Sequence, residues 1–332
     1  MSLDKEYFLN LYLKEDLHHL GLKALEIKEK LHGKHYYYTI NRHINYTNIC
    51  LLECKFCSYY KKPTDSDGYT LSIDKIVQSL REEEDLREVH IVGGLNPAIP
   101  YSYYIDLIKA IREFKPNLRI RAFTCVEIDF FSKRTNKPVE LVLMELKEAG
   151  LTSLPGGGAE ISSERIRRKL YPQKISFDRW LEIAKTAHRL GIKSNATLLF
   201  GHIETEEEII EHLIKLRKAQ EETGGFEAFI PLPFIPANTK LSHLRPPSAQ
   251  KILRTIAIAR ILLDNFPHVK AYWVFLGVSL AQIALLWGAD HIHGTVKEER
   301  ISEASRGTAS VSLTKEEIEN LIKEIGGIPI LQ

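Results

Sequence analysis

The chain has 332 residues, of which 44% are hydrophobic and 27% are charged, and its formal net charge is +2 at pH 7. This composition is typical of a globular protein with a large core, and it excludes an intrinsically disordered chain. The charges nearly balance and runs of one sign are short, so nothing indicates a nucleic-acid surface. We therefore expect no nucleic-acid partner.

The N-terminus has neither the basic start nor the uninterrupted apolar stretch of a secretory signal, and no window approaches 18 apolar residues without a charge. Four cysteines are too few for a small disulfide-stabilised secreted domain, and three of them lie within eight positions. These features predict a cytoplasmic protein without a membrane partner. The clustering suggests a metal site rather than disulfides.

Leucine and isoleucine recur among charged residues through the first 31 residues, from Leu9 to Ile27. This spacing predicts one or two amphipathic helices. We interpret residues 1–35 as an N-terminal helical extension and residues 36–332 as the main domain.

From residue 36 onward, short apolar or β-branched runs alternate with stretches of helical periodicity. The predicted strands cover residues 36–46, 88–92, 119–126, 151–154, 193–199, 226–230, 269–274 and 290–295. The predicted helices cover residues 73–84, 101–114, 136–149, 163–190, 205–222, 248–265, 279–287 and 314–324. Eight strand–helix units predict an α/β protein, a (β/α)8 TIM-type barrel. An open doubly wound sheet gives a similar alternation, so only the number of units and the motifs favour the barrel.

Cys50, Cys54 and Cys57 directly follow the first predicted strand. In a barrel this position is the C-terminal mouth, where active sites lie. The spacing lets three thiolates reach one iron–sulfur cluster, and three ligands for four irons leave one iron free to chelate a small molecule. Zinc is the competing interpretation, with Cys125 or a histidine as the fourth ligand, although structural zinc sites usually combine two separated pairs of ligands.

The C-x3-C-x-aromatic-C pattern, with Phe56 before the last cysteine, resembles the radical S-adenosylmethionine (SAM) superfamily. The resemblance implies that Cys50, Cys54 and Cys57 ligate a [4Fe–4S] cluster whose fourth iron binds the amino and carboxylate groups of SAM. It also implies that the reduced cluster cleaves SAM to methionine and a 5′-deoxyadenosyl radical. As part of the pattern, Phe56 is a candidate cofactor-binding residue.

Gly93 and Gly94 follow the second predicted strand, where paired glycines permit close approach of the backbone to a ligand. In the superfamily the equivalent turn contacts the SAM amino group, but an ordinary tight turn is an equal alternative. Glu127, at the end of the third predicted strand, is a candidate to bind substrate or a ribose hydroxyl. Its alternative is a salt bridge at a strand end.

Three successive glycines, residues 156–158, follow the fourth predicted strand and indicate a loop that lies close to a ligand. Glu160 and Arg179 resemble the acid and the arginine that bind the ribose and the carboxylate of SAM in relatives. An arginine fork suits a carboxylate. A flexible turn and an exposed arginine are the alternative.

His202 follows the fifth predicted strand and is a candidate to donate a proton or bind a substrate carboxylate, with a purely structural histidine as the alternative. Arg42, His43 and Asn45 lie near the end of the first predicted strand. From position alone, we predict that they help to hold the substrate's carboxylates.

Longer stretches resemble one branch of the superfamily, which includes aminofutalosine synthase, cyclic dehypoxanthinyl futalosine synthase and FO synthase subunits. These stretches are Arg42–Asn48, Leu154–Ile161, Gly201–Thr205 and Gln220–Phe226. Residues 230–239, 271–274 and 294–299 are most similar to the aminofutalosine synthases.

This resemblance implies a step of menaquinone biosynthesis. The adenosyl radical would add to the double bond of 3-[(1-carboxyvinyl)oxy]benzoate, and the adduct would rearrange and lose a carboxylate to give 6-amino-6-deoxyfutalosine. SAM would then be a consumed co-substrate, and a low-potential donor such as flavodoxin or ferredoxin would supply the electron. The cyclase, an FO synthase-like activity and a structural zinc-binding barrel are the alternatives.

Overall fold

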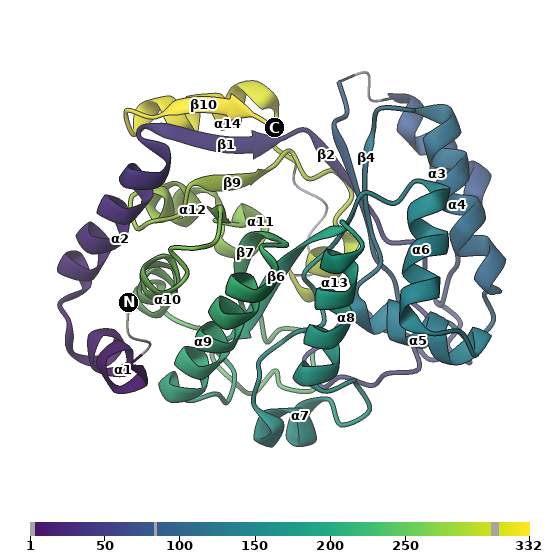
Figure 1. Cartoon of the computed structure of the whole chain (residues 1–332), viewed down its shortest axis with the longest axis horizontal. Helices are drawn as coiled ribbons and strands as arrows, with labels where there is room; N and C mark the ends of the chain where they lie inside the picture. Colours follow the sequence, from purple (N-terminus) through teal and green to yellow (C-terminus); the bar gives the residue numbers. More distant parts are fainter. Residues whose placement is uncertain (1–3, 83–84, 307–311) are drawn as a thin grey trace.

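The computed structural model describes residues 4–82, 85–306 and 312–332, and Figure 1 shows its elements. The strands are β1 (His35–Thr39), β2 (Asn41–Ile44), β3 (Glu88–Ile91), β4 (Arg119–Ala122), β5 (Ser153–Leu154), β6 (Lys193–Phe200), β7 (Phe226–Pro233), β8 (His268–Val269), β9 (His291–Gly294) and β10 (Ile328–Leu331). The helices are α1 (Lys5–Lys14), α2 (Leu17–His32), α3 (Ile73–Ser79) with the 3-10 turn η1 (Leu80–Glu82), α4 (Tyr101–Phe114), α5 (Cys125–Thr135), α6 (Val139–Ala149), α7 (Glu164–Leu170), α8 (Phe177–Arg189), α9 (Glu206–Thr223), α10 (Ala249–Leu262), α11 (Trp273–Leu276), α12 (Val278–Leu285), α13 (Arg300–Arg306) and α14 (Lys315–Glu324). The last two residues of the predicted helix 73–84 lie outside the described residues.

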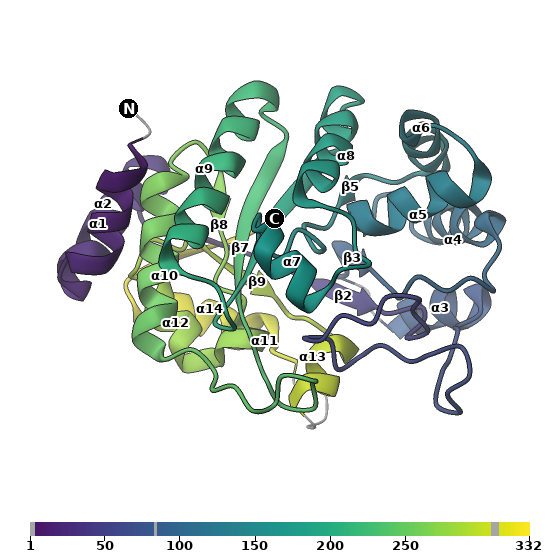
Figure 2. The ribbon, with the colours of Figure 1, turned by 90° about the horizontal axis from the view of Figure 1, so that it is seen from below.

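Parallel strands close into a barrel. β2 to β8 follow one another in chain order in a seven-stranded sheet, and a second sheet has the order β10-β1-β9. The sheets join where the Ala271 N–H donates to the His291 carbonyl at 2.8 Å and where β1 continues into β2. Figure 2 shows the helices around the outside of these strands. The predicted (β/α)8 TIM-type barrel is confirmed.

The segment predicted as one strand, residues 36–46, forms two strands, so the prediction of a single continuous strand is wrong. β1 pairs with β9 and β10, whereas β2 pairs with β3. Ile40 lies between them, and its carbonyl accepts the N–H groups of Arg87 and Glu88. The chain therefore changes its pairing strands at Ile40. The positions of the neighbouring strands, not the β-propensity of residues 36–46, determine where this change occurs.

Three other predicted elements are divided or change partly from strand to helix. The strand predicted at 119–126 ends at Ala122, because Thr124 and Glu127 form a capping box that starts α5. The helix predicted at 163–190 is divided into α7 and α8 around Pro172, which cannot continue a helix. The strand predicted at 269–274 gives only β8, and Trp273 begins α11.

The N-terminal helices α1 and α2 pack on the outer side of α9 and α10, as Figure 1 shows at the left of the molecule. Phe8 and Leu20 are buried in the same apolar cluster as the barrel helices, and the Tyr12 hydroxyl lies 3.0 Å from Thr255 Oγ1. The division of the chain at residue 35 stays a prediction.

A layer of charged side chains fills the barrel interior near the start of the strands. The Arg121 guanidinium on β4 donates to Glu88 on β3 and, across the barrel, to Glu227 on β7, at 3.1 Å in each case. Lys270, next to the end of β8, is also buried. Side chains two residues further along each strand therefore form the next layer towards the mouth.

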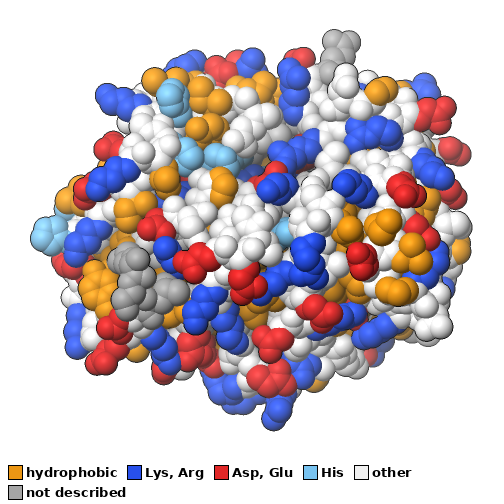
Figure 3. Space-filling view, in the orientation of Figure 1, with side chains coloured by type: hydrophobic (Ala, Val, Ile, Leu, Met, Phe, Trp, Pro, Cys, Tyr) orange, Lys and Arg blue, Asp and Glu red, His pale blue; other side chains and the backbone are white. Residues whose placement is uncertain are grey.

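The surface carries both signs of charge. Figure 3 shows lysine and arginine interspersed with aspartate and glutamate over one face, in keeping with the net charge of +2. Within the described residues, no helix combines the length and the apolar composition needed to cross a membrane.

Candidate active site

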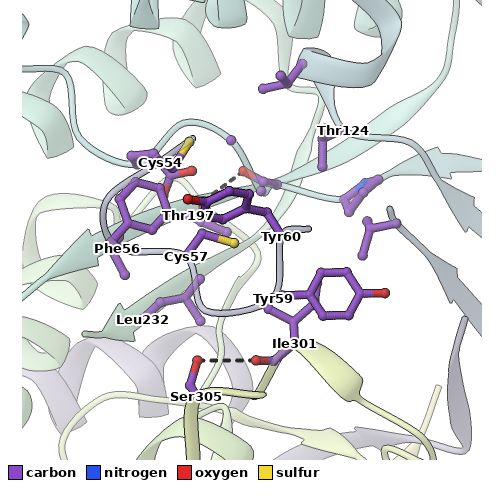
Figure 4. A pocket seen from close by; sticks show the side chains of 18 of the residues that line it. Cys54, Phe56, Cys57, Tyr59, Tyr60, Thr124, Thr197, Leu232, Ile301 and Ser305 are labelled. Carbon is purple, nitrogen blue, oxygen red and sulfur yellow. Dashed lines mark hydrogen bonds between the residues drawn. The ribbon is translucent and has the colours of Figure 1, made fainter. Parts of the chain in front are cut away.

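A cavity of about 310 Å³ lies at the C-terminal mouth of the barrel. The loop after β2, the turns after β3 and β5, and side chains of β6, β7 and β9 border it. The three clustered cysteines all line this cavity, whereas Cys125 does not. Figure 4 shows Cys54, Phe56 and Cys57 on one loop beside Tyr60, with Thr124 and Thr197 on other elements around the same space.

The loop that carries the cysteines is held by side chains that precede them. Thr47 Oγ1 donates to the Tyr69 carbonyl at 2.6 Å, and Asn48 bonds the backbone of Asp67 and Tyr69. The Cys50 thiol sulfur accepts the Leu95 N–H at 3.3 Å. The Thr-Asn pair therefore fixes the fold of the loop, a role that the sequence pattern did not reveal.

The three thiols fit an iron–sulfur cluster better than a single zinc ion. All three are free, and burial raises the pKa of each, that of Cys54 to about 12, so a ligating thiolate needs a compensating positive centre. A structural zinc ion needs four ligands, and Cys125, the remaining cysteine, does not line the cavity, so the three thiols suit a cluster whose fourth iron binds another group.

The turn after β3 packs directly on the cysteine loop. A Cβ on Gly94 would lie 2.2 Å from the Ile49 carbonyl oxygen and 2.8 Å from the Cys50 Cβ, and one on Gly93 would lie 2.6 Å from the Tyr46 ring. Both glycines line the cavity. Glycine is required here for contact with the protein itself, whatever ligand the turn also meets.

Glu127 is predicted at the end of a strand, but it lies on the first turn of α5. Because α5 begins at the mouth of the barrel, Glu127 still lines the cavity. Its carboxylate accepts from the Tyr46 hydroxyl at 2.7 Å, the Thr124 N–H at 2.7 Å and the Gly93 N–H at 3.2 Å. Burial raises the pKa of Glu127 to about 7 despite these donors. Glu127 thus ties the turn after β3 to α5.

Glu160 faces the cavity and forms an ion pair there with Lys174, whose Nζ lies 2.5 Å from the carboxylate. The same ammonium lies 5.2 Å from the centre of the Phe56 ring. Burial alone would lower the pKa of Lys174, but Glu160 and Cys54 outweigh it and hold that pKa above its usual value. Lys174 is therefore a cation beside the cysteine loop that sequence reasoning missed.

The structure does not bring Arg179 to the cavity. Arg179 lies on α8, where its guanidinium bonds Asp129 at 2.9 Å and Glu182 at 2.8 Å. The loop between α7 and α8 places Lys174, not Arg179, next to Glu160. The assignment of Glu160 and Arg179 to the ribose and the carboxylate of SAM stays a prediction.

The structure also places three predicted catalytic residues outside the cavity lining. The His202 side chain is fully buried, and its Nδ1 accepts the Ile203 N–H at 2.7 Å and lies 3.0 Å from Glu204. Arg42 pairs with Glu298 at 2.7 Å, and Asn45 donates to the Val92 carbonyl. These contacts fit the alternative of a structural role for His202, and they hold the chain around the mouth.

His43 does line the cavity, together with two histidines that the prediction missed. His90 on β3 and His293 on β9 lie beside it, and ligand nitrogens of the three rings all lie within 4.8 Å of one another. The signal was present in the sequence, since His291 and His293 alternate in a predicted strand, but alternation does not reveal which face is internal.

Comparisons with known proteins match both parts of the chain. Residues 44–216 match the radical SAM superfamily, and residues 223–332 match the CofH/MqnC C-terminal region. The aminodeoxyfutalosine synthase of Thermus thermophilus is 42% identical over 97% of this chain and 88% of its own length.

Relatives with other names are also similar. The 5-amino-6-(D-ribitylamino)uracil–L-tyrosine 4-hydroxyphenyl transferase of Archaeoglobus fulgidus is 40% identical over 92% of this chain and 89% of its own. The cyclic dehypoxanthine futalosine synthase of Halalkalibacterium halodurans is 35% identical over 98% and 89%.

Among solved structures, methylornithine synthase (PylB) has a TM-score of 0.80 at 17% identity, over 99% of this chain and 95% of that one, which supports the fold. The resemblance inferred from the cysteine motif is confirmed. The chain belongs to the radical SAM superfamily, in the branch that contains the aminodeoxyfutalosine and cyclic dehypoxanthine futalosine synthases, and it is an enzyme that uses a [4Fe–4S] cluster and SAM.

Proposed function

We propose that this enzyme catalyses the aminofutalosine synthase reaction. It would join the adenosyl group of SAM to 3-[(1-carboxyvinyl)oxy]benzoate, with loss of a carboxylate, to give 6-amino-6-deoxyfutalosine for menaquinone biosynthesis. The observation that carries this proposal is the 42% identity to the Thermus thermophilus aminodeoxyfutalosine synthase over nearly the whole chain.

In this proposal Cys50, Cys54 and Cys57 hold the cluster. When bound, the cluster supplies the electron that cleaves the sulfonium bond of SAM, and a low-potential protein such as flavodoxin or ferredoxin replenishes it. Three thiolates would leave one iron of the cluster free to bind the amino and carboxylate groups of SAM. The Lys174 ammonium, beside Cys54, favours the thiolate form of that ligand.

The remaining cavity residues would position SAM and exclude water. Gly93 and Gly94 let the turn after β3 approach closely, while Glu127 fixes that turn and Glu160 presents a carboxylate to the same space. Apolar side chains form much of the wall, among them Leu199, Ile230, Leu232 and Phe234. A dry wall protects a carbon radical from stray hydrogen donors, and the cavity volume lies at the lower end of the range for small-molecule sites.

A second candidate function is favoured by the 40% identity to the Archaeoglobus fulgidus transferase, whose name describes transfer of a 4-hydroxyphenyl group from L-tyrosine. The cyclase is a third, with 35% identity. All three would use the same cysteines and the same cavity mouth, so only the acceptor distinguishes them.

The test is product analysis with anaerobically reconstituted, dithionite-reduced enzyme and SAM. One sample receives 3-[(1-carboxyvinyl)oxy]benzoate, and a second receives L-tyrosine with 5-amino-6-(D-ribitylamino)uracil. We expect a product that retains the adenosine carbons in the first sample alone. Release of 5′-deoxyadenosine with product only in the second sample would overturn the proposal. The Cys57→Ser variant is the control and should give no product with either acceptor.

A further inference from the structure

Three histidines form one layer of the barrel interior, two of them buried and His90 half-buried. His43 on β2 and His90 on β3 are register partners, with ring centres 4.6 Å apart, and His293 on β9 lies 5.8 Å from His43. His90 lies two residues beyond Glu88 on β3, so the histidine layer lies directly above the charged layer. All three rings line the cavity whose mouth carries the cysteines.

These histidines have polar atoms that the protein does not satisfy. His43 Nε2, His90 Nδ1 and both ring nitrogens of His293 are buried without a hydrogen-bond partner. Buried polar atoms are nearly always paired, and an unpaired one costs about 1–3 kcal/mol. Several such atoms converging on one cavity indicate a polar ligand at its floor.

The surrounding charged side chains indicate whether that ligand carries a positive or a negative charge. Lys270 is a cationic neighbour of all three rings, and Arg121 is a second one of His90. His43 also faces Glu88, and its Nδ1 lies 3.9 Å from Glu299. Glu88 lies in the layer below, where Arg121 binds its carboxylate, whereas the charges that act most on His90 and His293 are positive. Such a field favours an anion over a metal cation.

We propose that His43, His90 and His293 bind the ring carboxylate of the aromatic substrate at the floor of the cavity. This inference rests on the proposed function for the identity of the ligand. Each neutral imidazole can donate one N–H, and a carboxylate can accept all three. The Tyr272 ring, stacked on His293 with centres 4.0 Å apart, provides a flat wall beside the benzene ring.

This placement also orients the reacting atoms. The histidines lie on the strands themselves, while the cysteines lie in the loop beyond the end of β2. A benzoate anchored at the floor therefore points its 3-substituent, the enol ether, towards the mouth where SAM is bound. The three histidines are positioning residues that set the distance between the double bond and the adenosyl carbon.

The experiment measures binding to the cluster-loaded, oxidised enzyme by calorimetry, with benzoate and with 3-[(1-carboxyvinyl)oxy]benzoate as probes. In His90→Leu and His293→Leu, we expect Kd for both probes to rise by about 10- to 100-fold, as expected for loss of hydrogen bonds to a charged group. The ester of the ring carboxylate should bind the wild type as weakly as the acid binds the variants. His243→Leu, at an exposed position, is the matched control and should bind like the wild type.

Iron content and the far-UV circular dichroism spectrum of both variants should match those of the wild type, which shows that they fold and load the cluster. Unchanged Kd values in the variants would overturn the proposal, and so would stoichiometric zinc binding that requires His90 and His293. If benzoate binding depends on the histidines but the wild type makes no 6-amino-6-deoxyfutalosine, only the proposed function fails. If that product forms while the variants bind benzoate normally, only this inference fails.

Discussion

At the scale of single residues, Glu160 and Lys174 form a buried ion pair that acts on the Cys54 thiol. Glu160 has a positive φ of 48° and follows the three-glycine loop, so its side chain direction is set by an unusual backbone turn. The two side chains are only 11% and 10% exposed. Each charge therefore depends on the other, because little water reaches either.

Replacement of Lys174 by methionine should leave the Glu160 carboxylate buried without its partner. We expect the free energy of unfolding to fall by about 3–5 kcal/mol, as is usual when one member of a buried pair is removed. Urea unfolding of the cluster-free chain measures it. In the double variant Lys174→Met, Glu160→Gln, most of the loss should be regained. A double variant that is as unstable as Lys174→Met would show that the pair is not the cause.

A second residue-scale prediction concerns Gly94, where a Cβ would overlap the Ile49 carbonyl. Gly94→Ala should displace the cysteine loop and lower the iron bound per chain after anaerobic reconstitution to less than about half, since backbone atoms cannot give way cheaply. Gly157→Ala is the matched control in the same cavity, because its Cβ meets only a side-chain methyl of Thr124 at 3.3 Å. Equal iron content in the two variants would contradict the prediction.

At the scale of elements, a neutral histidine of α9 hydrogen-bonds the barrel strand β6. His212 Nδ1 accepts the Ser162 N–H at 3.1 Å, and its Nε2 lies 3.0 Å from the Thr197 carbonyl of β6, which needs an N–H on that atom. Burial lowers the pKa of His212 to about 3. Protonation would place the Nδ1–H of His212 against the Ser162 N–H, so both hydrogen bonds of the ring form together only when it is neutral.

His212 therefore makes stability depend on pH. The folded-state pKa is below the ordinary value of 6.5, so its contribution is complete above pH 6.5 and is lost as the pH falls towards 3. Between pH 7.5 and pH 5, we expect a loss of about 2 kcal/mol from this group. In His212→Gln the drop in unfolding free energy over that interval should be smaller by this amount, whereas the exposed control His243→Gln should keep the full drop. Urea unfolding at both pH values measures it.

At the scale of the whole molecule, the N-terminal helices share the core of the barrel. Leu20 on α2 is fully buried against α10, and the Arg254 side chain of α10 donates to the Tyr12 carbonyl of α1 at 2.8 Å. The segment that the sequence indicated as an extension thus covers apolar surface of the helical layer.

Truncation of Leu20 to alanine should lower the free energy of unfolding by about 2–5 kcal/mol, because it leaves a cavity between α2 and α10. Leu22 lies on the same helix but is 49% exposed, so Leu22→Ala is the matched control and should cost less than about 0.5 kcal/mol. Similar losses in the two variants, by urea unfolding, would show that α2 is not part of the core.

The sequence by itself determined features that depend on local signals. The helix predicted at 101–114 is α4 to the residue, and the helix predicted at 205–222 is α9, which begins after the cap residue Thr205. The cysteine spacing identified the superfamily and the cofactors, because one short loop supplies all three thiols. The eight strand–helix units were readable because each has its own periodicity.

Only the tertiary structure decided which distant side chains meet. Strand partners divide residues 36–46 at Ile40, Lys174 rather than Arg179 reaches Glu160, and His202 is buried away from the cavity. His43, His90 and His293 are about 50 and 200 residues apart in the chain, and only closure of the barrel brings them onto one floor. Local sequence encodes the elements and their ends, but the barrel's closure determines which side chains face a common interior.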